Sequence, residues 1–391
     1  MEFKPEDAYL EHRAAARAWV ARNLDPKWVE EQESTGTHQT PELHRRLAAD
    51  GFLGASWPAE YGGSGADPAL ASAVFQEIAG AGAHTSAWNT TSMVLNTVLH
   101  VGTEQQKKDW LSAAARGEMT VVLGYTEPGS GSDVAAAKAR AVRDGDEWVI
   151  NGSKMFTSTA DASTHVFLLC RTNLDVPKHR GLTMFLVPLD APGVEIQPMH
   201  TLGGQRTNAT FYSDVRIPDT YRVGEVDGGW GVMRVALVYE RVVSAPPTGA
   251  TWADRGAAWA RSVKQADGGA PLLDDPVVRD RLAHIAIETE VARLMADRVT
   301  WMVRTGGMPA VEGALAKLYT TEGDQRNLSS LLDLIGEDAV LQGEEGDDFV
   351  RAVEAAHRKA VVGTIYGGTS EIMREIIAER KLGLPRSRPG N

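Results

Sequence analysis

The most informative part of this chain reads Tyr125-Thr126-Glu127-Pro128-Gly129-Ser130-Gly131-Ser132-Asp133, and a second run reads Val149-Ile150-Asn151-Gly152-Ser153-Lys154-Met155-Phe156. In the first run, proline and two glycines force an irregular backbone whose amides can point at a ligand, and the hydroxyls add donors. The second run is typical of a strand that ends in an aromatic residue, with Asn151-Gly152 as a hairpin signal. Together they predict a ligand-holding loop beside an aromatic ring. Taken singly, each run fits an ordinary solvated turn or a core residue.

Length and composition limit what the protein can be. Its 391 residues exceed the roughly 250 to 300 at which a single core stops growing, so two or three domains are expected. A net charge of −12 disfavours nucleic acid and anionic membranes as main partners, because like charges repel. The single cysteine, Cys170, lies in an apolar run and is expected in the core, and no metal site is predicted. The charged first residues and the lack of a long apolar run lead us to expect a soluble cytoplasmic protein.

The pattern of apolar residues changes twice along the chain. The first third contains cap-plus-proline helix starts at Thr40-Pro41 and Asp67-Pro68, and a capping box from Thr103 to Gln106. Short β-branched and aromatic runs dominate the middle, at residues 147–150, 165–170, 182–188, 194–199 and 209–217. Helical periodicity then returns, through residues 275–305, 311–334 and 349–362. We therefore predict an α+β protein with an N-terminal helical domain (1–117), a central β domain (118–226) and a C-terminal helical bundle (227–391).

In order and spacing, these residues resemble the flavin-binding stretch of the acyl-CoA dehydrogenase family. The similarity runs from about residue 104 to residue 217, and it resumes from 366 to 385. The resemblance implies an N-terminal helical domain, a central β-barrel-like domain and a C-terminal four-helix bundle, with FAD as the cofactor. It also implies a reaction in which a base removes the α-proton of an acyl-CoA thioester while the β-hydride passes to flavin N5.

The resemblance assigns cofactor contacts residue by residue. Thr126 matches the residue whose hydroxyl contacts the flavin ring, Gly131 and Ser132 match phosphate and ribityl contacts, and Ser158 matches the hydroxyl residue near N5. Phe156 stands where the family more often has tryptophan, and its smaller ring can still stack on the flavin. The other implied cofactor residues are Tyr125, Tyr366, Thr369 and Glu371, of which Glu371 is either a helix-capping charge or an adenine-side contact.

The run Tyr366-Gly367-Gly368-Thr369 departs from the commonest family pattern, Tyr-Glu-Gly-Thr. Many members carry the base directly after the tyrosine, but Gly367 has no side chain to accept a proton. In the family the backbone N–H at that position polarises the thioester carbonyl, and glycine keeps its N–H. We therefore expect Gly367 to stabilise the oxyanion and the base to lie elsewhere.

Glu240 is the substitute carboxylate that we expect to act as the base. On a helix it would share a face with Ala236 and Leu237, where burial would raise its pKa toward the range of a general base. The pair Glu240-Arg241 resembles that of isovaleryl-CoA and long-chain members, which carry the base on this helix, and it places Arg241 at the substrate. The alternative is a helix-end carboxylate that reaches solvent or pairs with Arg241.

Two segments that complete the flavin diphosphate site of a neighbouring subunit in homotetrameric members are not visible. The family segments Arg-x-x-Phe-Gly and Gln-x-x-Gly-Gly align with residues 259–269 and 334–340, where Arg261 is the one candidate match and its phenylalanine partner is missing. The chain therefore resembles the catalytic subunit of the heteromeric acyl-CoA dehydrogenases of steroid side-chain degradation. This resemblance implies a second, acyl-CoA dehydrogenase-like subunit in a heterotetramer. Small residues at Gly367-Gly368 would also admit a bulky or branched acyl group.

The sequence thus predicts an FAD-dependent acyl-CoA dehydrogenase, with electron-transferring flavoprotein as the expected reoxidant. One alternative is a flavin acyl-CoA oxidase or monooxygenase on the same fold. Another is a non-catalytic partner subunit, against which Glu240 and the intact Thr-Glu-Pro motif count. The basic run Lys178-His179-Arg180 is either a contact for CoA phosphates or a solvated surface cluster.

Overall fold

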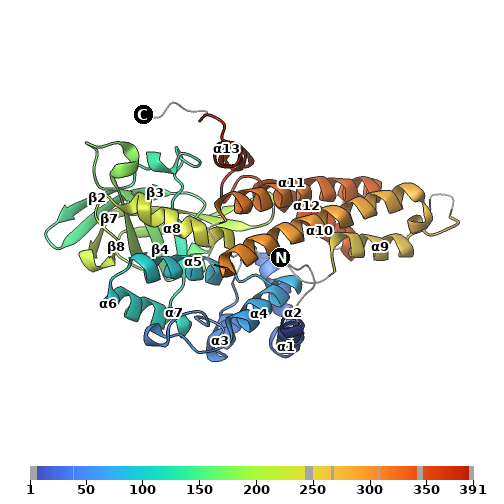
Figure 1. Ribbon diagram of the computed structural model, residues 1–391, viewed down its shortest axis with the longest axis horizontal. Coiled ribbons are helices and arrows are strands. Elements are labelled where there is room, and N and C mark those ends of the chain that lie inside the picture. Colours follow the sequence, from blue (N-terminus) through green and yellow to red (C-terminus); the bar gives the residue numbers. More distant parts are fainter. Residues whose placement is uncertain are drawn as a thin grey trace. The chain divides into compact units, whose positions relative to one another are not determined.

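The computed structural model describes residues 7–37, 39–242, 250–265, 268–305, 309–340 and 347–386. For residues 8, 9, 33, 238, 240–242, 303, 304 and 310 it describes the backbone alone. The chain forms two compact units, which we describe separately (Figure 1). The β unit comprises residues 2–201 and 205–243, and the helical unit comprises residues 202–204 and 244–391.

The β unit begins with helices whose ends follow the sequence signals. Asp25 and Asp67 cap α2 and α4 by accepting hydrogen bonds from backbone amides two residues further on, and Thr103 and Gln106 form the predicted capping box. Helix α4 ends at Gly80. The helices are α1 (Asp7–Asn23), α2 (Pro26–Thr35), α3 (Pro41–Ala49), α4 (Pro68–Gly80), α5 (Ser86–Val101), α6 (Glu104–Gln106) and α7 (Ser112–Ala115), with a π-helical turn at Lys107–Leu111.

A mixed, eight-stranded sheet follows. Its strands pair in the order β6-β7-β3-β2-β4-β5-β8, and β1 pairs in parallel with β4. Most other pairs are antiparallel, and β2–β3, β4–β5 and β6–β7 also follow each other along the chain, whereas β3 and β7 are distant in sequence. The strands are β1 (Val121–Gly124), β2 (Arg140–Asp144), β3 (Glu147–Lys154), β4 (His165–Arg171), β5 (Leu182–Pro188), β6 (Val194–His200), β7 (Arg206–Pro218) and β8 (Arg222–Val223).

The predicted hairpin turn at Asn151-Gly152 is wrong. Both residues lie inside β3, and the turn that joins β2 to β3 contains Gly145 instead, at φ 64°. Gly152 marks a bulge against β7, and a Cβ on it would lie 2.6 Å from the Cα of Ala139. Glycine is therefore required here for close backbone approach rather than for chain reversal.

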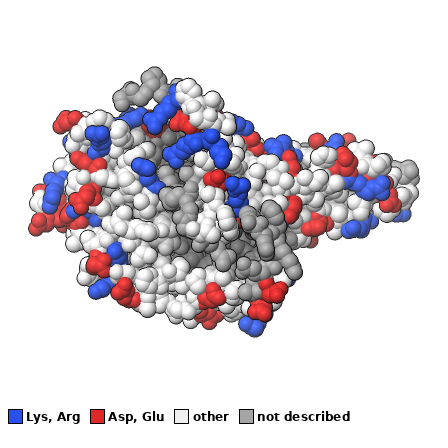
Figure 2. Space-filling view, in the orientation of Figure 1, with Lys and Arg blue, Asp and Glu red and all other residues white. Residues whose placement is uncertain are grey.

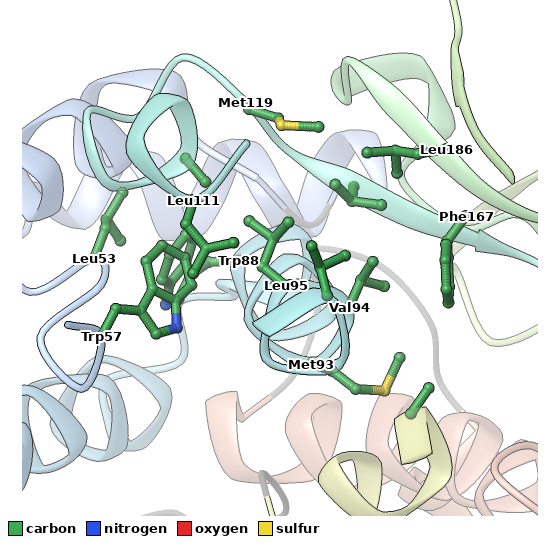
Figure 3. Close-up of a cluster of buried hydrophobic side chains, with 14 of the residues drawn as sticks. Leu53, Trp57, Trp88, Met93, Val94, Leu95, Leu111, Met119, Phe167 and Leu186 are labelled. Atoms are coloured by element: carbon green, nitrogen blue, oxygen red, sulfur yellow. The ribbon is translucent and has the colours of Figure 1, made fainter. Parts of the chain in front are cut away.

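One apolar core joins the N-terminal helices to the sheet (Figure 3). Trp88 and Leu95 of α5 lie between the helical side, represented by Leu111, and the side chains of Phe167 and Leu186 on β4 and β5. Helix α8 (Gly229–Val242) packs against α5 and joins the same core. Cys170 is buried in a second cluster of this unit, which confirms its predicted core position. The loop that follows β1 therefore starts from a rigid, buried support.

The helical unit contains α9 (Trp252–Ser262), α10 (Pro276–Arg304), α11 (Ala310–Ile335), α12 (Asp348–Gly363) and α13 (Ser370–Arg380). Helix α11 packs against α10, α12 and α13, and the ring of Trp259 stacks on Phe349 in the core. Figure 2 shows basic side chains standing among acidic ones along these helices, and pairs such as Arg293–Glu290 and Arg358–Glu354 explain this mixture. Charges of both signs on the outer faces are typical of solvated helices.

Helices, then strands, then helices follow one another along the chain, which confirms the predicted α+β class. The division into three domains at residues 117 and 226 stays a prediction. Within the described ranges, no helix is both long enough and apolar enough to cross a membrane.

Candidate functional site

Two segments of the β unit meet where the sequence predicted a ligand site. We call the loop of residues 125–133 and the turn of residues 155–159 the loop–turn pair. The loop follows β1 and the turn follows β3. The backbone N–H of Met155 donates to the carbonyl of Thr126 at 2.9 Å, and the ammonium of Lys154 donates to the carbonyl of Tyr125 at 3.3 Å. Residues distant in the sequence, such as Thr126 and Phe156, are thereby brought to one place.

The loop leaves several of its amides available. Glu127 and Ser130 close a tight turn through two backbone hydrogen bonds of 3.0 and 3.1 Å. Among the described residues, the N–H groups of Gly129, Gly131 and Ser132 have no acceptor. A Cβ added to either glycine would meet nothing within 4 Å, so open space lies beside these amides. The hydroxyl of Ser130 is buried and also has no partner. Successive backbone N–H groups without acceptors in an irregular loop can form an anion-binding site.

The turn holds an aromatic ring in solvent on a strained backbone. Phe156 has φ 59° and its side chain is 62% exposed, and Thr159 has φ 62°. A non-glycine residue in the left-handed region is unfavourable by about 1 to 2 kcal/mol, and such strain persists mainly at functional sites. Between them, Thr157 is clamped, because its N–H donates to Asn208 at 2.8 Å and its carbonyl accepts from the Asn208 amide at 3.1 Å. The ring of Phe156 therefore stands on a fixed support.

Ser158 lies beside this ring. Its hydroxyl is 2.9 Å from that of Thr207 on β7, and its backbone N–H donates to the carbonyl of Phe156. Thr126, on the loop side, is a half-buried residue. The loop–turn pair thus presents hydroxyl groups, free amides and an apolar ring together. This combination suits a planar aromatic ligand that carries an anionic arm.

A buried ion pair joins the loop to the end of β3, and no role was predicted for it from the sequence. Lys154 is fully buried, and its Nζ lies 2.8 Å from Oε1 of Glu127, which is 8% exposed. The carboxylate of Glu127 also accepts hydrogen bonds from the backbone N–H groups of Lys138 and Ala139, at 2.7 and 2.8 Å. Burial lowers the pKa of Lys154. Burial opposes ionisation of Glu127, but Lys154 and the two amides outweigh it and lower the pKa of Glu127.

The far end of the loop is fixed by two basic residues. The buried guanidinium of Arg171 donates to the carbonyls of Ala135 and Ala137, and also to that of Lys178. Lys178 in turn forms a 2.7 Å ion pair with Asp133. The basic run at residues 178–180 therefore begins with a residue that is tied to the loop, rather than with a free surface charge.

The helical unit contributes a second segment, the glycine turn of residues 366–369. Gly367 and Gly368 have φ 63° and 93°, and a Cβ on Gly368 would lie 2.4 Å from Cε of Met373. Within the described residues, the N–H of Gly367 has no acceptor. Thr369 ends the turn as the N-cap of α13, where its hydroxyl accepts from the amide of Ile372 at 3.3 Å. The turn therefore requires glycine and leaves one backbone donor available.

A pocket of about 410 Å³ borders the glycine turn within the helical unit. Ser370 contributes a buried hydroxyl that has no partner, and Glu371 stands at the start of α13. The amide of Glu371 itself and the Thr369 hydroxyl lower the pKa of this carboxyl, as expected of a helix-capping charge. The pocket is lined by Glu322, Gln325, Arg326, Thr364, Ile365, Thr369, Ser370 and Glu371.

The predicted base lies on α8 of the β unit. Glu240 and Arg241 belong to the last turn of this helix, but their side chains lie outside the described part of the structure. The other predicted residues fall into two groups, one in each unit. The β unit brings together Tyr125, Thr126, Gly131, Ser132, Phe156 and Ser158. The helical unit brings together Tyr366, Gly367, Thr369 and Glu371.

Comparison with known proteins gives the family. Three family models match the chain: the acyl-CoA dehydrogenase N-terminal domain over residues 6–118, the middle domain over 106–217 and the C-terminal domain over 227–382. The acyl-CoA dehydrogenase FadE26 of Mycobacterium tuberculosis is 35% identical over 401 residues, which cover 99% of both chains.

Solved structures agree with these matches. A chain of the ChsE4-ChsE5 complex from Mycobacterium tuberculosis has a TM-score of 0.88 at 32% identity, and the match covers 99% of this chain and 100% of that one. A chain of the steroid ACAD Tcur3481-Tcur3483 has a TM-score of 0.85 at 34% identity, with the same coverage. These matches confirm the predicted enzyme class and fold. The chain belongs to the acyl-CoA dehydrogenase family.

Proposed function

We propose that this protein catalyses the FAD-dependent α,β-dehydrogenation of an acyl-CoA thioester. The observation that carries the proposal is the exposed ring of Phe156, held on a strained backbone beside the free amides of the loop–turn pair. Exposure of one apolar ring is common, but backbone strain of this kind is concentrated at ligand sites, and here it occurs beside amides that have no acceptor.

The residues present fit FAD. Phe156 offers an aromatic face for the flavin ring, and Thr126 and Ser158 offer hydroxyls beside it. The free amides of Gly131 and Ser132 suit a phosphate. The pocket beside Thr369 in the helical unit has the volume of an ordinary ligand site, about 300 to 1,000 Å³, and it is lined by Thr369 and Glu371, which the resemblance assigns to the cofactor. When bound, FAD accepts the hydride that leaves the β-carbon of the substrate.

Groups of the chain itself remove the α-proton and polarise the thioester carbonyl. The carboxylate of Glu240 takes the α-proton, and this proton is acidified as the thioester oxygen gains negative charge. The N–H of Gly367, which has no other acceptor among the described residues, donates to that oxygen. Arg241, next to the base, is assigned to substrate binding.

The acyl group that we propose is bulky or branched, such as a steroid side chain. Gly367-Gly368 leaves room where other members carry a glutamate, and one similar structure is named a steroid ACAD. We also propose a second, acyl-CoA dehydrogenase-like subunit in a heterotetramer, with electron-transferring flavoprotein as oxidant. A similar chain comes from a structure named as a complex of two proteins, ChsE4-ChsE5.

Anaerobic bleaching of the flavin absorbance by a panel of acyl-CoAs, from short straight chains to steroid thioesters, tests the reaction and the acyl preference together. Glu240→Gln is expected to abolish bleaching and enoyl-CoA formation while the oxidised flavin spectrum persists. Glu225→Gln, which changes an exposed carboxylate outside the site, is the control and should bleach normally. Unchanged turnover in Glu240→Gln would rule out this base. Peroxide release in air would favour the oxidase instead.

The partner is tested by flavin content. Expressed alone, the chain should retain little FAD, and co-expression with an acyl-CoA dehydrogenase-like partner subunit should restore it, because that partner would lend the missing diphosphate contacts. A fully loaded homomer would contradict the heteromer.

A further inference from the structure

Lys317 reaches from α11 to the glycine turn, more than fifty residues further along the chain. Its ammonium donates to the carbonyl of Gly368, and the same nitrogen lies 5.9 Å from the ring centroid of Tyr366. The ion–carbonyl bond is partly buried, so water competes with it less than at the surface. One side chain thus holds the turn at two points.

The glycine turn needs such a restraint. Its backbone is pinned on one side by the bond from Tyr366 N–H to the Val362 carbonyl at 3.1 Å, and on the other by the bond from Ser370 N–H to the Thr364 carbonyl at 3.0 Å. Between these bonds stand two glycines, the residues with the greatest backbone freedom. Within the described ranges, the one hydrogen bond that we find for Gly367 or Gly368 is the bond from the Lys317 ammonium to the Gly368 carbonyl.

We propose that Lys317 is a positioning residue that restrains the glycine turn on both sides of Gly367, through the Tyr366 ring and the Gly368 carbonyl, and so narrows the range of directions open to the Gly367 N–H. The Gly368 carbonyl and the Gly367 N–H belong to different peptide planes, so the restraint acts on the turn as a whole. This inference rests on the proposed function, in which that amide polarises the thioester carbonyl. An oxyanion donor stabilises a transition state only when it already points to the place where charge develops. Other members have a residue with a side chain at the position of Gly367, and that side chain limits the backbone conformations. In this chain Lys317 of α11 supplies the restraint on the glycine turn instead.

A purely structural role for Lys317 makes a different prediction, and the chain offers a control for it. Arg374 of α13 also binds α11, through a 2.8 Å hydrogen bond to Glu322. Arg374→Met therefore removes a cation and a link between the same two helices without touching the glycine turn. If Lys317 only held α13 against α11, the two substitutions would have the same effects.

The test uses the flavin-loaded protein, with its partner subunit if that is required, and the variants Lys317→Met, Lys317→Arg and Arg374→Met. The first readout is the carbonyl stretching frequency of bound enoyl-CoA, labelled with ¹³C at C1 and prepared from the panel thioester that the wild type oxidises fastest. The frequency reports polarisation of the carbonyl directly. The second readout is kcat and KM for the parent thioester.

In Lys317→Met, the carbonyl frequency should move toward its value in water, and kcat should fall by about 10- to 100-fold with KM changed less than about threefold, because the lost interaction belongs to the transition state. Lys317→Arg keeps a cationic donor and should recover part of both effects. Arg374→Met should keep the wild-type frequency. If Lys317→Met does not fold, Lys317→Gln is used, and the same frequency shift is expected.

A wild-type frequency in folded Lys317→Met or Lys317→Gln overturns the proposal, as does an equal shift in Arg374→Met. These outcomes differ from failure of the proposed function. In that case the wild-type protein itself would not be bleached by any thioester of the panel.

Discussion

The hydroxyl of Tyr239 on α8 is hydrogen-bonded to Nε2 of His100 on α5, and the two rings stack with their centroids 5.7 Å apart. Burial raises the pKa of Tyr239, so the phenol stays protonated at neutral pH. The contact fastens the last turn of α8 to a helix of the β-unit core. Glu240, the proposed base, is the next residue on this turn.

Tyr239→Phe keeps the ring and removes the hydrogen bond. We expect kcat to fall by about 3- to 10-fold with little change in flavin content, because the helix turn that carries the base loses an anchor. His100→Ala should act in the same way, and the double variant should lose no more than either single one. Steady-state kinetics of the double-mutant cycle measures this coupling, and strictly additive losses would show that the two residues act separately.

The ion pair between Lys154 and Glu127 gives a second prediction. Lys154→Met leaves a buried carboxylate without its partner, and we expect a loss of about 3 to 5 kcal/mol of stability. The double variant Lys154→Met with Glu127→Leu should recover much of that stability, since an apolar pair avoids desolvated charge. It should still bind flavin weakly, because the bond from Lys154 to the Tyr125 carbonyl and the bonds from the Lys138 and Ala139 amides to Glu127 are gone.

Thermal unfolding and flavin titration separate the two effects of this ion pair. Recovery of stability together with wild-type flavin affinity in the double variant would mean that the pair has no role in shaping the loop.

Backbone strain and ring contact at the aromatic turn can be separated. Phe156→Gly relieves the left-handed strain but removes the ring, so we expect unchanged or slightly higher thermal stability and flavin binding weaker by about tenfold or more. Thr159→Gly relieves the same kind of strain three residues away and keeps the ring. It should bind flavin as the wild type does. Equal losses of flavin affinity in the two variants would assign the effect to the backbone rather than to the ring.

His44 predicts how stability depends on pH. Its ring is buried, its Nε2 has no partner, and burial lowers its pKa from 6.5 to about 4. Between these two pH values the unfolded chain takes up a proton that the folded chain does not bind. Stability from this group is therefore complete above about pH 6.5 and falls on acidification, by about 3 kcal/mol at pH 4.

His44→Leu should flatten the decline of the melting temperature between pH 6.5 and 4. The decline should not vanish, because burial also lowers the pKa of His165 to about 4. An unaltered pH profile in His44→Leu would contradict the assignment.

Local signals in the sequence were sufficient for much of the fold. The cap at Asp67, the capping box from Thr103 to Gln106 and the return of helical periodicity after the strands were predicted from spacing alone, because these features depend on neighbouring residues. The strands β1, β2 and β8 were not predicted. They are short, and they are strands because they hydrogen-bond to neighbouring strands.

Only part of the candidate site was predicted, because some of its features depend on neighbouring residues and others on residues distant in the sequence. Free amides in the loop followed from proline and glycine in sequence, but the strained, exposed position of Phe156 did not. The error at Gly152 has a related cause. Asn-Gly in isolation favours a turn, and only contact with Ala139 from the neighbouring backbone shows that this glycine makes room for close packing.

The sequence by itself determined the order of helices and strands, the family motifs and the replacement of the usual glutamate by Gly367. Tertiary structure alone decided that Lys154 of β3 pairs with Glu127 of the loop, and that Lys317 donates to a carbonyl of the glycine turn. Both contacts join residues from different elements, and a charged residue in a single sequence carries no mark of the partner it meets. In the folded chain water is excluded from such a charged residue, and its bond to a partner then holds two elements together.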